Sequence, residues 1–290
     1  MARVTRSLAG KVVVITGGGR GIGAATAAAL VDGGARVVIG DLDLQVAEQT
    51  AARLGAAALA LPLDVTDRPG FTAFLDEAER RVGPMDVLVN NAGIMPLGRF
   101  EDESDRTTGH QLDINLHAVI HGTREAVKRM VPRKNGHIVN IASAAGKAGF
   151  PGGAVYCATK HGVVGLSEAV RMELRGSGVE VSVVMPAIVR TELASGLGEA
   201  RFFKSVEASD VAKAIVKTLQ RPVFDVFVPR SLASTFRFTR MLPRSAAEWV
   251  ARTLKGDQIL LGASPQARAD YEARAAASAP AADRETETAG

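Results

Sequence analysis

The sequence predicts a single α/β domain built on a doubly wound, Rossmann-like parallel sheet. Three observations predict this fold. Short β-branched runs recur along the first 190 residues, and longer amphipathic stretches rich in Ala, Leu, Glu and Arg separate them. The runs are continuously apolar, which is typical of strands buried on both faces of a sheet. Strand–helix alternation at this spacing implies right-handed crossovers between parallel strands.

About seven strands are expected. Ala residues and Pro62 dilute the third strand, and the seventh follows a helix that begins near Ser209-Asp210. In chain order the expected strands are 12–15, 37–39, 57–63, 87–89, 138–141, 179–184 and 224–228. The expected helices between the first six strands are 22–31, 44–54, 71–82, 117–131 and 158–175.

Composition limits the class of protein. Of 290 residues, 47% are hydrophobic and 23% are charged, the balance of a globular protein with one large core. The net charge of +4 is mild, so nucleic acid is not an expected partner. The first apolar run breaks at Gly17 and none is long enough to cross a membrane, so neither a signal peptide nor a transmembrane helix is expected. The single cysteine, Cys157, makes no intramolecular disulfide, which favours a cytoplasmic location.

A glycine-rich turn, Thr16-Gly17-Gly18-Gly19-Arg20-Gly21-Ile22-Gly23, joins the first strand to the first helix. Glycines let the backbone turn tightly and let a bulky anion approach it. The following helix directs its free N–H groups and positive dipole end at that anion. The spacing is not the G-x-G-x-x-G fingerprint, and no Lys-Ser/Thr follows as in a Walker loop. In its strand–turn–helix setting, the turn nevertheless predicts binding of a dinucleotide.

Asp41 and Arg20 bear on which dinucleotide binds. Asp41 ends the second strand, 18 residues after Gly23, where a carboxylate accepts hydrogen bonds from the adenosine ribose and repels a 2′-phosphate. Two like charges about 4 Å apart cost about 4 kcal/mol at an effective dielectric of about 20. Arg20 argues the other way because it could bind a 2′-phosphate, unless it pairs with Asp41 or the pyrophosphate. We weight Asp41 more, so NAD is expected in preference to NADP. Asp43 could be only a helix cap.

Several polar residues are expected at the same edge of the sheet. Tyr156 and Lys160 are spaced i, i+4 at the start of an expected helix, which puts both on one face. Ser143 lies just past one strand, Asn90-Asn91-Ala92-Gly93 follows another, and Asn115 opens a helix. The carboxyl ends of strands are where open α/β sheets bind ligands.

On these motifs the sequence resembles the short-chain dehydrogenase/reductase family over roughly residues 10 to 230. It carries the family's T-G-x-x-x-G-I-G, N-N-A-G and Asn–Ser–Tyr–Lys patterns at the positions quoted above. The resemblance implies an oxidoreductase that acts on CH–OH groups with NAD or NADP. One departure is Pro186-Ala187, where the family usually has Pro-Gly, and it is expected to shift the backbone under the nicotinamide without abolishing binding.

The resemblance further implies that Asp64 and Val65 contact the adenine and that Thr191 contacts the nicotinamide carboxamide. The expected catalytic residues are Asn115, Ser143, Tyr156 and Lys160. The expected cofactor contacts are Gly17, Arg20, Gly21, Ile22, Gly23, Asp41, Asp64, Val65, Asn91, Ala92, Gly93, Tyr156, Lys160, Pro186, Val189 and Thr191. No metal is expected, since the i, i+4 pair His117 and His121 has no Glu or Cys cluster beside it.

The residue types predict their roles. A free tyrosine has a pKa of about 10, so the pKa of Tyr156 must fall for it to act as acid and base near neutrality. An ammonium at Lys160, about 4 Å away, would supply about 4 kcal/mol toward that, with a nicotinamide cation adding to it. Ser143 is expected to hydrogen-bond the substrate oxygen. Lys160 is expected also to hold the ribose, and Asn115 to position a water that relays the proton.

The chain is expected to divide into an NAD(P)-binding catalytic domain at 8–229, a helical extension at 230–274 and a disordered tail at 275–290. Six basic residues and one acid lie between Arg230 and Lys255, interleaved with aromatic and aliphatic side chains. Two interpretations of that segment stay open. It packs over the substrate cleft or a neighbouring subunit, or it lies on an anionic membrane as a peripheral contact through 230–255.

The substrate is expected to be an apolar secondary alcohol or ketone, because the expected lid at 190–205 and Phe150 are rich in apolar side chains. Two alternatives are a 3-oxoacyl carrier-protein reductase that uses NADPH and a non-catalytic, dinucleotide-binding regulatory protein. The resemblance implies a homodimer or homotetramer formed through the helices 117–131 and 158–175. Cys157 is expected to be a small packed residue.

Overall fold

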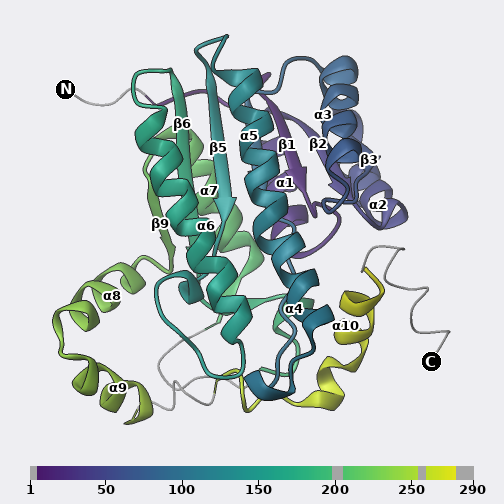
Figure 1. The fold of residues 1–290 in the computed structure, drawn as a ribbon. Coiled ribbons are helices and arrows are strands. Elements are labelled where there is room, and N and C mark those ends of the chain that lie inside the picture. Colours follow the sequence, from purple (N-terminus) through teal and green to yellow (C-terminus); the bar gives the residue numbers. More distant parts are fainter. Residues whose placement is uncertain (1–4, 198–204, 254–258, 279–290) are drawn as a thin grey trace.

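The computed structural model describes residues 5–197, 205–253 and 259–278. Its centre is a parallel sheet of seven strands in the order β3-β2-β1-β4-β5-β6-β9, which confirms the predicted fold class (Figure 1). The strands are β1 (Val12–Thr16), β2 (Arg36–Asp41), β3 (Ala58–Pro62), β4 (Val87–Asn90), β5 (Gly136–Ile141), β6 (Val179–Pro186) and β9 (Asp225–Val228).

Two helix layers cover the sheet. The helices α1 (Gly21–Asp32), α2 (Leu44–Leu54) and α7 (Ala208–Gln220) cover one face, and α3 (Arg68–Val82), α5 (Ala118–Met130) and α6 (Ala154–Glu173) cover the other (Figure 1). In β1, Val13 and Ile15 join the core on the α1 side, while Val14 joins the core beneath α3. Successive side chains of a strand point to opposite faces, so a strand covered on both sides must be apolar throughout.

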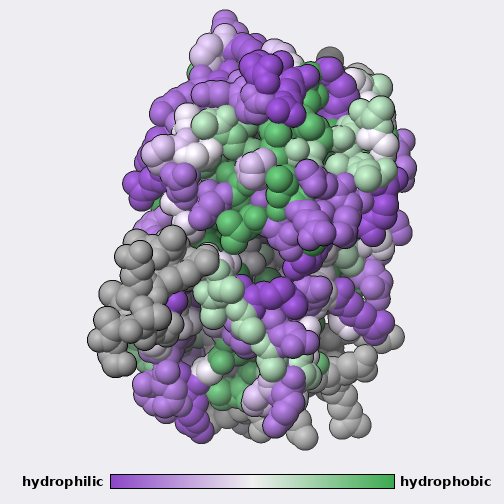
Figure 2. Space-filling model, turned by 90° about the vertical axis from the view of Figure 1, so that its right-hand side faces the viewer, coloured by the Kyte–Doolittle hydropathy of each residue, from purple (hydrophilic) through white to green (hydrophobic). Residues whose placement is uncertain are grey.

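The edge strand β3 is less completely covered than the others, which explains its diluted sequence. Most of its residues are half-buried, whereas every residue of β1 is buried. Figure 2 views the molecule from the side of α2, α3 and α10 and shows an apolar band flanked by polar surface, as expected where the sheet edge approaches solvent.

Some local structure was not predicted. Ser104 caps the short helix α4 (Asp105–Leu112) by accepting a hydrogen bond from the Thr107 N–H, and few apolar residues mark this helix in the sequence. A π-helical segment, Asp113–His117, joins α4 to α5. Single π-turns are frequently found at functional sites. A small second sheet pairs β7 (Val189–Arg190) with β8 (Val206–Glu207).

Three helices follow β9. These are α8 (Ser231–Met241), α9 (Arg244–Thr253) and α10 (Pro265–Ala277). All three lie at the end of the molecule where the strands finish (Figure 1). Residues 275–277, expected to begin a disordered tail, belong to α10, whose first turn is fixed by the Ser264 cap and by Pro265. Ser278 ends that helix as its C-cap, and the rest of the expected tail, 279–290, lies outside the described residues. Among the described helices, none is long and apolar enough to cross a membrane.

A buried histidine ties β5 to β6. The hydroxyl of Ser182 has one proton, which it donates to the Val223 carbonyl at 2.6 Å. Its oxygen therefore accepts the second hydrogen bond, from the Nε2 of His137 at 2.8 Å. That arrangement needs an imidazole that carries a proton on Nε2. Burial, with a smaller contribution from the nearby Arg6, lowers the pKa of His137 from 6.5 to about 3, so the ring is neutral near pH 7.

We predict that His137 makes the protein less stable as the pH falls below 6.5. Below that pH the histidine of the unfolded chain is protonated, whereas the buried His137 of the folded chain stays neutral down to about pH 3. The free energy of unfolding therefore falls by about 1.4 kcal/mol for each unit that the pH drops between these two values. A His137→Gln variant, which cannot titrate, should lose that part of the slope in urea unfolding measured from pH 7 to about pH 4. Equal slopes in the two proteins would contradict the assignment.

Candidate active site

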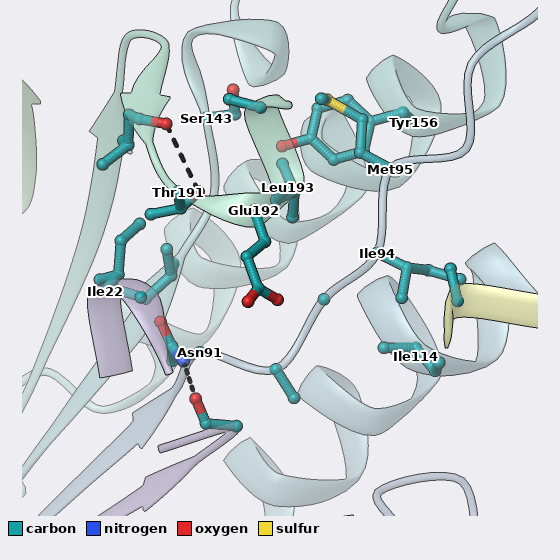
Figure 3. Close-up of a pocket in the computed structure, with 18 of the residues that line it drawn as sticks. Ile22, Asn91, Ile94, Met95, Ile114, Ser143, Tyr156, Thr191, Glu192 and Leu193 are labelled. Carbon is teal, nitrogen blue, oxygen red and sulfur yellow. Dashed lines mark hydrogen bonds between the residues drawn. The ribbon is translucent and has the colours of Figure 1, made fainter. Parts of the chain in front are cut away.

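A cavity of about 560 Å³ opens at the carboxyl ends of the strands. Figure 3 shows residues of the glycine turn, the β4 exit and α6 around it. Of the residues expected at the site, all line this cavity except Gly23 and Asn115. Both of these lie behind the surface of the cavity and support residues that line it.

The glycine turn is built by close backbone approach. Gly17 and Gly21 have φ angles of +61° and +53°, which favour glycine. A Cβ on Gly23 would lie 2.3 Å from the Gly17 carbonyl oxygen, so α1 can begin this close to the turn only without a side chain there. The first turn of α1 carries no acidic residue, which leaves its positive end free for an anion.

Asn91 braces this turn from the end of β4. Its amide donates to the carbonyls of Thr16, at 2.9 Å, and Gly17, at 2.8 Å. In return, the Thr16 hydroxyl accepts the backbone N–H groups of Asn91 and Ala92. The N-N-A-G motif therefore fixes the shape of the turn as well as lining the cavity.

Asp41 faces the cavity beside the turn. Its carboxylate accepts the backbone N–H groups of Gly19, at 2.8 Å, and Asp43, at 3.1 Å. Arg20 does not pair with Asp41, as one sequence interpretation had it. It pairs instead with Asp43 at 2.7 Å and lies 3.9 Å from Glu192. Asp43 also caps α2 by accepting the Val46 N–H, as expected.

These features fit a dinucleotide. The turn leaves no room for a Cβ, the helix end has no competing acid, and a carboxylate faces the cavity where a ribose would lie. Asp64, Val65, Pro186, Val189 and Thr191 line the same cavity. Thr191 lies directly against the turn, since a Cβ on Gly21 would be 3.2 Å from its methyl carbon.

Tyr156 and Lys160 both point inward from the first turns of α6. That helix begins at Ala154, four residues earlier than predicted, so the pair lies inside it. The Lys160 Nζ donates to the Ile141 carbonyl at 3.1 Å and lies 5.6 Å from the centre of the Tyr156 ring. Ser143 follows β5 and caps the next short turn, and its hydroxyl lies close enough to the phenol to lower the pKa of Tyr156. Ser143 and Tyr156 lie near each other on one side of the cavity (Figure 3).

The expectation that a Lys160 ammonium lowers the pKa of Tyr156 is not met in this structure. Burial raises the pKa of Tyr156 to about 12, and only the nearby Ser143 hydroxyl opposes this. Burial also lowers the pKa of Lys160 to about 8. Both side chains are withdrawn from water, so both are drawn toward their neutral forms.

Asn115, in the π-helical segment, is completely buried. Its Oδ1 accepts the Ile94 N–H at 2.8 Å, and its Nδ2 donates to the Ile94 carbonyl at 2.8 Å and to the Thr159 hydroxyl at 3.3 Å. Both amide hydrogens are used, so this side chain fastens the β4 exit to α6. These contacts give the side chain a positioning role toward protein groups, and the water that we expected Asn115 to position stays a prediction.

The other end of the cavity is apolar and includes residues that the sequence did not point to. Phe150, Leu193 and Leu197 line it, as expected, whereas Phe202 and Phe203 of the expected lid lie outside the described residues. The unexpected lining residues come from the C-terminal segment: Ile259, Leu260, Tyr271, Arg274, Ala275, Ala277 and Ser278. The chain has only two tyrosines, Tyr156 and Tyr271, and both line this cavity. The rarity of tyrosine in the sequence could therefore have drawn attention to Tyr271.

His117 and His121 have separate partners. The Nδ1 of His117 lies 2.8 Å from Asp113, and the Nε2 of His121 lies 3.2 Å from the Thr72 hydroxyl. No group of three or more potential ligands was found among the described residues. The buried Cys157 thiol accepts the Phe150 N–H, and burial raises the pKa of this thiol, as befits a packed residue.

Comparison with known proteins agrees with this geometry. A family model described as "short chain dehydrogenase" matches residues 11–201. A 3-alpha-(or 20-beta)-hydroxysteroid dehydrogenase of Mycobacterium tuberculosis is 40% identical over 192 residues, which cover 66% of this chain and 74% of that protein.

Two solved structures are similar along most of their length. A short-chain dehydrogenase/reductase from Burkholderia phymatum, in complex with NAD, has a TM-score of 0.75 and 28% identity, covering 81% of this chain and 95% of that one. A 3-ketoacyl-(acyl-carrier-protein) reductase from Brucella melitensis, complexed with NADH, has a TM-score of 0.71 and 29% identity, covering 77% and 98%.

We predict that Gly23→Ala weakens NADH binding by about tenfold or more, because the new methyl group overlaps the Gly17 carbonyl and must push the turn out of shape. Gly109→Ala is the matched control, since it also adds a methyl group to a helix glycine but finds nothing within 4 Å. Titration by NADH fluorescence measures both. Equal affinity in the two variants would show that the turn does not hold the cofactor.

Proposed function

This chain belongs to the short-chain dehydrogenase/reductase family, and we propose that its substrate is an apolar secondary alcohol or ketone that it oxidises or reduces with NAD. As an oxidoreductase of this family it transfers hydride between a nicotinamide cofactor and a CH–OH or carbonyl group. The observation that carries the finer proposal is one cavity lined by the glycine turn, by Ser143, Tyr156 and Lys160, and by an apolar wall.

When bound, the nicotinamide ring accepts or donates the hydride, and its oxidised form brings a positive charge. Tyr156 exchanges the proton with the substrate oxygen. Because burial raises the pKa of this phenol to about 12, it is protonated near neutrality, which is the form that a donor to a ketone oxygen needs. The Ser143 hydroxyl, on the same side of the cavity as the phenol (Figure 3), donates to the same oxygen. In the direction of oxidation, positive charge at Lys160 favours the phenolate.

Two features support NAD rather than NADP. The Asp41 carboxylate lines the cavity at the end of β2 and would repel a 2′-phosphate. Arg20, the cation that could have neutralised such a phosphate, pairs with Asp43. The alternative, a 3-oxoacyl carrier-protein reductase that uses NADPH, is disfavoured on the same grounds. The non-catalytic alternative has no need of the Ser143, Tyr156 and Lys160 set.

The membrane interpretation of 230–255 is supported on the part that is described. Phe238, Met241 and Trp249 are 63%, 83% and 66% exposed on α8 and α9, and exposed Arg230, Arg237 and Arg244 accompany them. Aromatic and basic side chains together suit an anionic lipid surface. Full-length protein that fails to sediment with vesicles of anionic phospholipid would remove this proposal.

A cytoplasmic homodimer or homotetramer formed through α5 and α6 remains part of the proposal. The exposed Met172 at the end of α6 is an apolar residue that such a contact could cover. Size-exclusion chromatography with light scattering measures the oligomeric state, and a monomer at micromolar concentration would exclude the assembly.

We predict that Tyr156→Phe abolishes turnover, by about 10²–10⁴-fold or more, while NADH affinity is retained. The variant removes only the hydroxyl that exchanges the proton and leaves the ring and Lys160 in place. The assay follows reduced-nicotinamide absorbance over a panel of apolar alcohols and ketones, and fluorescence titration measures binding. Substantial turnover by the variant would assign the acid/base role elsewhere.

We predict that Asp41→Ser narrows the preference for NADH over NADPH by about tenfold or more, because it removes the carboxylate that repels the 2′-phosphate. Glu48→Ser, which removes an exposed carboxylate from α2, controls for the change in net charge. Affinities for both cofactors are measured side by side. If NADPH already binds the wild type as tightly as NADH, the NAD assignment fails.

A further inference from the structure

The helix α10 lies outside the residues matched by the family, yet it forms part of the cavity. It is fastened at its start, where the Ser264 N–H donates to the Gly196 carbonyl at 2.9 Å. It is fastened again near its end, where the His110 Nε2 of α4 lies 3.1 Å from the Ala275 carbonyl. Gly196 follows β7 and His110 belongs to α4, so α10 bridges two segments that lie far apart in the sequence.

Arg268 makes the central contacts of this helix. Although it is an arginine, it is only 2% exposed. One terminal nitrogen donates to the carbonyls of Leu193, at 3.0 Å, and Ser195, at 2.9 Å. The other donates to the Met95 carbonyl at 2.7 Å, and the Nε donates to Glu272 at 2.9 Å. The rigid, planar guanidinium suits several acceptors held in fixed directions.

Tyr271 supports the same arrangement. Its ring stacks on the Arg268 guanidinium at 4.8 Å, and its hydroxyl accepts the Met95 N–H at 2.7 Å. The backbone of Met95 is therefore held on both its N–H and its carbonyl by one helix. A single segment far along the chain thus fixes the residue that follows the β4 exit.

These contacts concern the substrate because the carbonyls that Arg268 binds belong to the segments that form the apolar end of the cavity. Met95 and Leu193 both line the apolar end of the cavity, Met95 from the segment after β4 and Leu193 from the segment after β7 (Figure 3). Both pack in one cluster with Tyr156. The turn that precedes α10 completes this cluster with the buried Ile259 and Leu260.

We propose that Arg268 is a positioning residue that sets the width of the substrate pocket, which makes α10 the specificity element of this enzyme. The proposal rests on the proposed function for its substrate class, an apolar ketone or alcohol. Arg268 touches neither the reacting atoms nor the glycine turn. It acts through Met95 and the 193–195 segment, whose carbonyls it holds at a fixed separation. Binding geometry is sensitive to such separations, since a wall misplaced by about 1 Å can cost a large factor in rate.

The test compares Arg268→Met, which keeps the bulk of the side chain but removes its donors, with Arg268→Lys, which keeps the charge. The matched control is Arg244→Met. Arg244 also pairs with a glutamate at i+4, Glu248, but its side chain is 93% exposed and joins no wall of the cavity. All variants are made in the full chain, and thermal unfolding verifies that each is folded.

Two readouts separate positioning from general stability. Hydrogen exchange of the backbone amides should speed up at Met95 and at 193–196 in Arg268→Met but not in Arg244→Met. With apolar ketones from cyclohexanone to decalone, KM should rise about tenfold or more in Arg268→Met, while kcat and the NADH dissociation constant change by less than about threefold. Arg268→Lys should recover part of the KM effect, because it donates fewer hydrogen bonds in fixed directions.

Unchanged exchange at both walls, or a KM equal to that of Arg244→Met, would overturn the proposal. So would a parallel rise in KM and in the NADH dissociation constant, since a loosened fold would affect both. A wild-type protein that turns over no ketone or alcohol would instead overturn the proposed function. The exchange experiment would still decide whether Arg268 holds the two walls together.

Discussion

The five residues after β4, Asn91 to Met95, hold the two halves of the site together. Asn91 ties the glycine turn, Ile94 is bound through both its backbone groups by the Asn115 amide, and Met95 is bound through both of its own by α10. Buried backbone groups need partners, and here each partner comes from a different element. Any displacement of this segment would reach the cofactor turn, α6 and the apolar wall together.

Burial governs the electrostatics of Tyr156 and Lys160. A phenol and an ammonium withdrawn from water are both pushed toward their neutral forms, and the structure has Tyr156 and Lys160 shifted in those opposite directions. A charge introduced into such a site acts at low dielectric, so it is felt more strongly than in water. The buried pair is therefore suited to respond to a change of charge on a neighbouring group.

The sequence was a good guide wherever local chemistry decides structure. The continuous apolar runs of β1 and β5 predicted strands that are covered on both faces. The glycine turn and the Tyr156–Lys160 spacing predicted that these residues lie together at one edge of the sheet. It failed where long-range packing decides. No residue near Asn115 in the sequence indicates that its side-chain amide will hydrogen-bond the backbone of Ile94. The pKa of Tyr156 likewise depends on burial, which only the assembled fold produces. In the sequence Arg268 cannot be told apart from the other basic residues of the expected helices, because its three carbonyl partners lie over 70 residues away.

The position of α10 after the residues that the family model matches has a consequence for how such enzymes diversify. The glycine turn, Ser143, Tyr156 and Lys160 lie within the matched residues, whereas part of the apolar wall comes from residues after them. Mutations in the later segment can alter which molecules are accepted while the reaction chemistry is inherited intact. Exchange of the C-terminal region between relatives is accordingly a natural route by which new selectivities could arise, in evolution or in the laboratory.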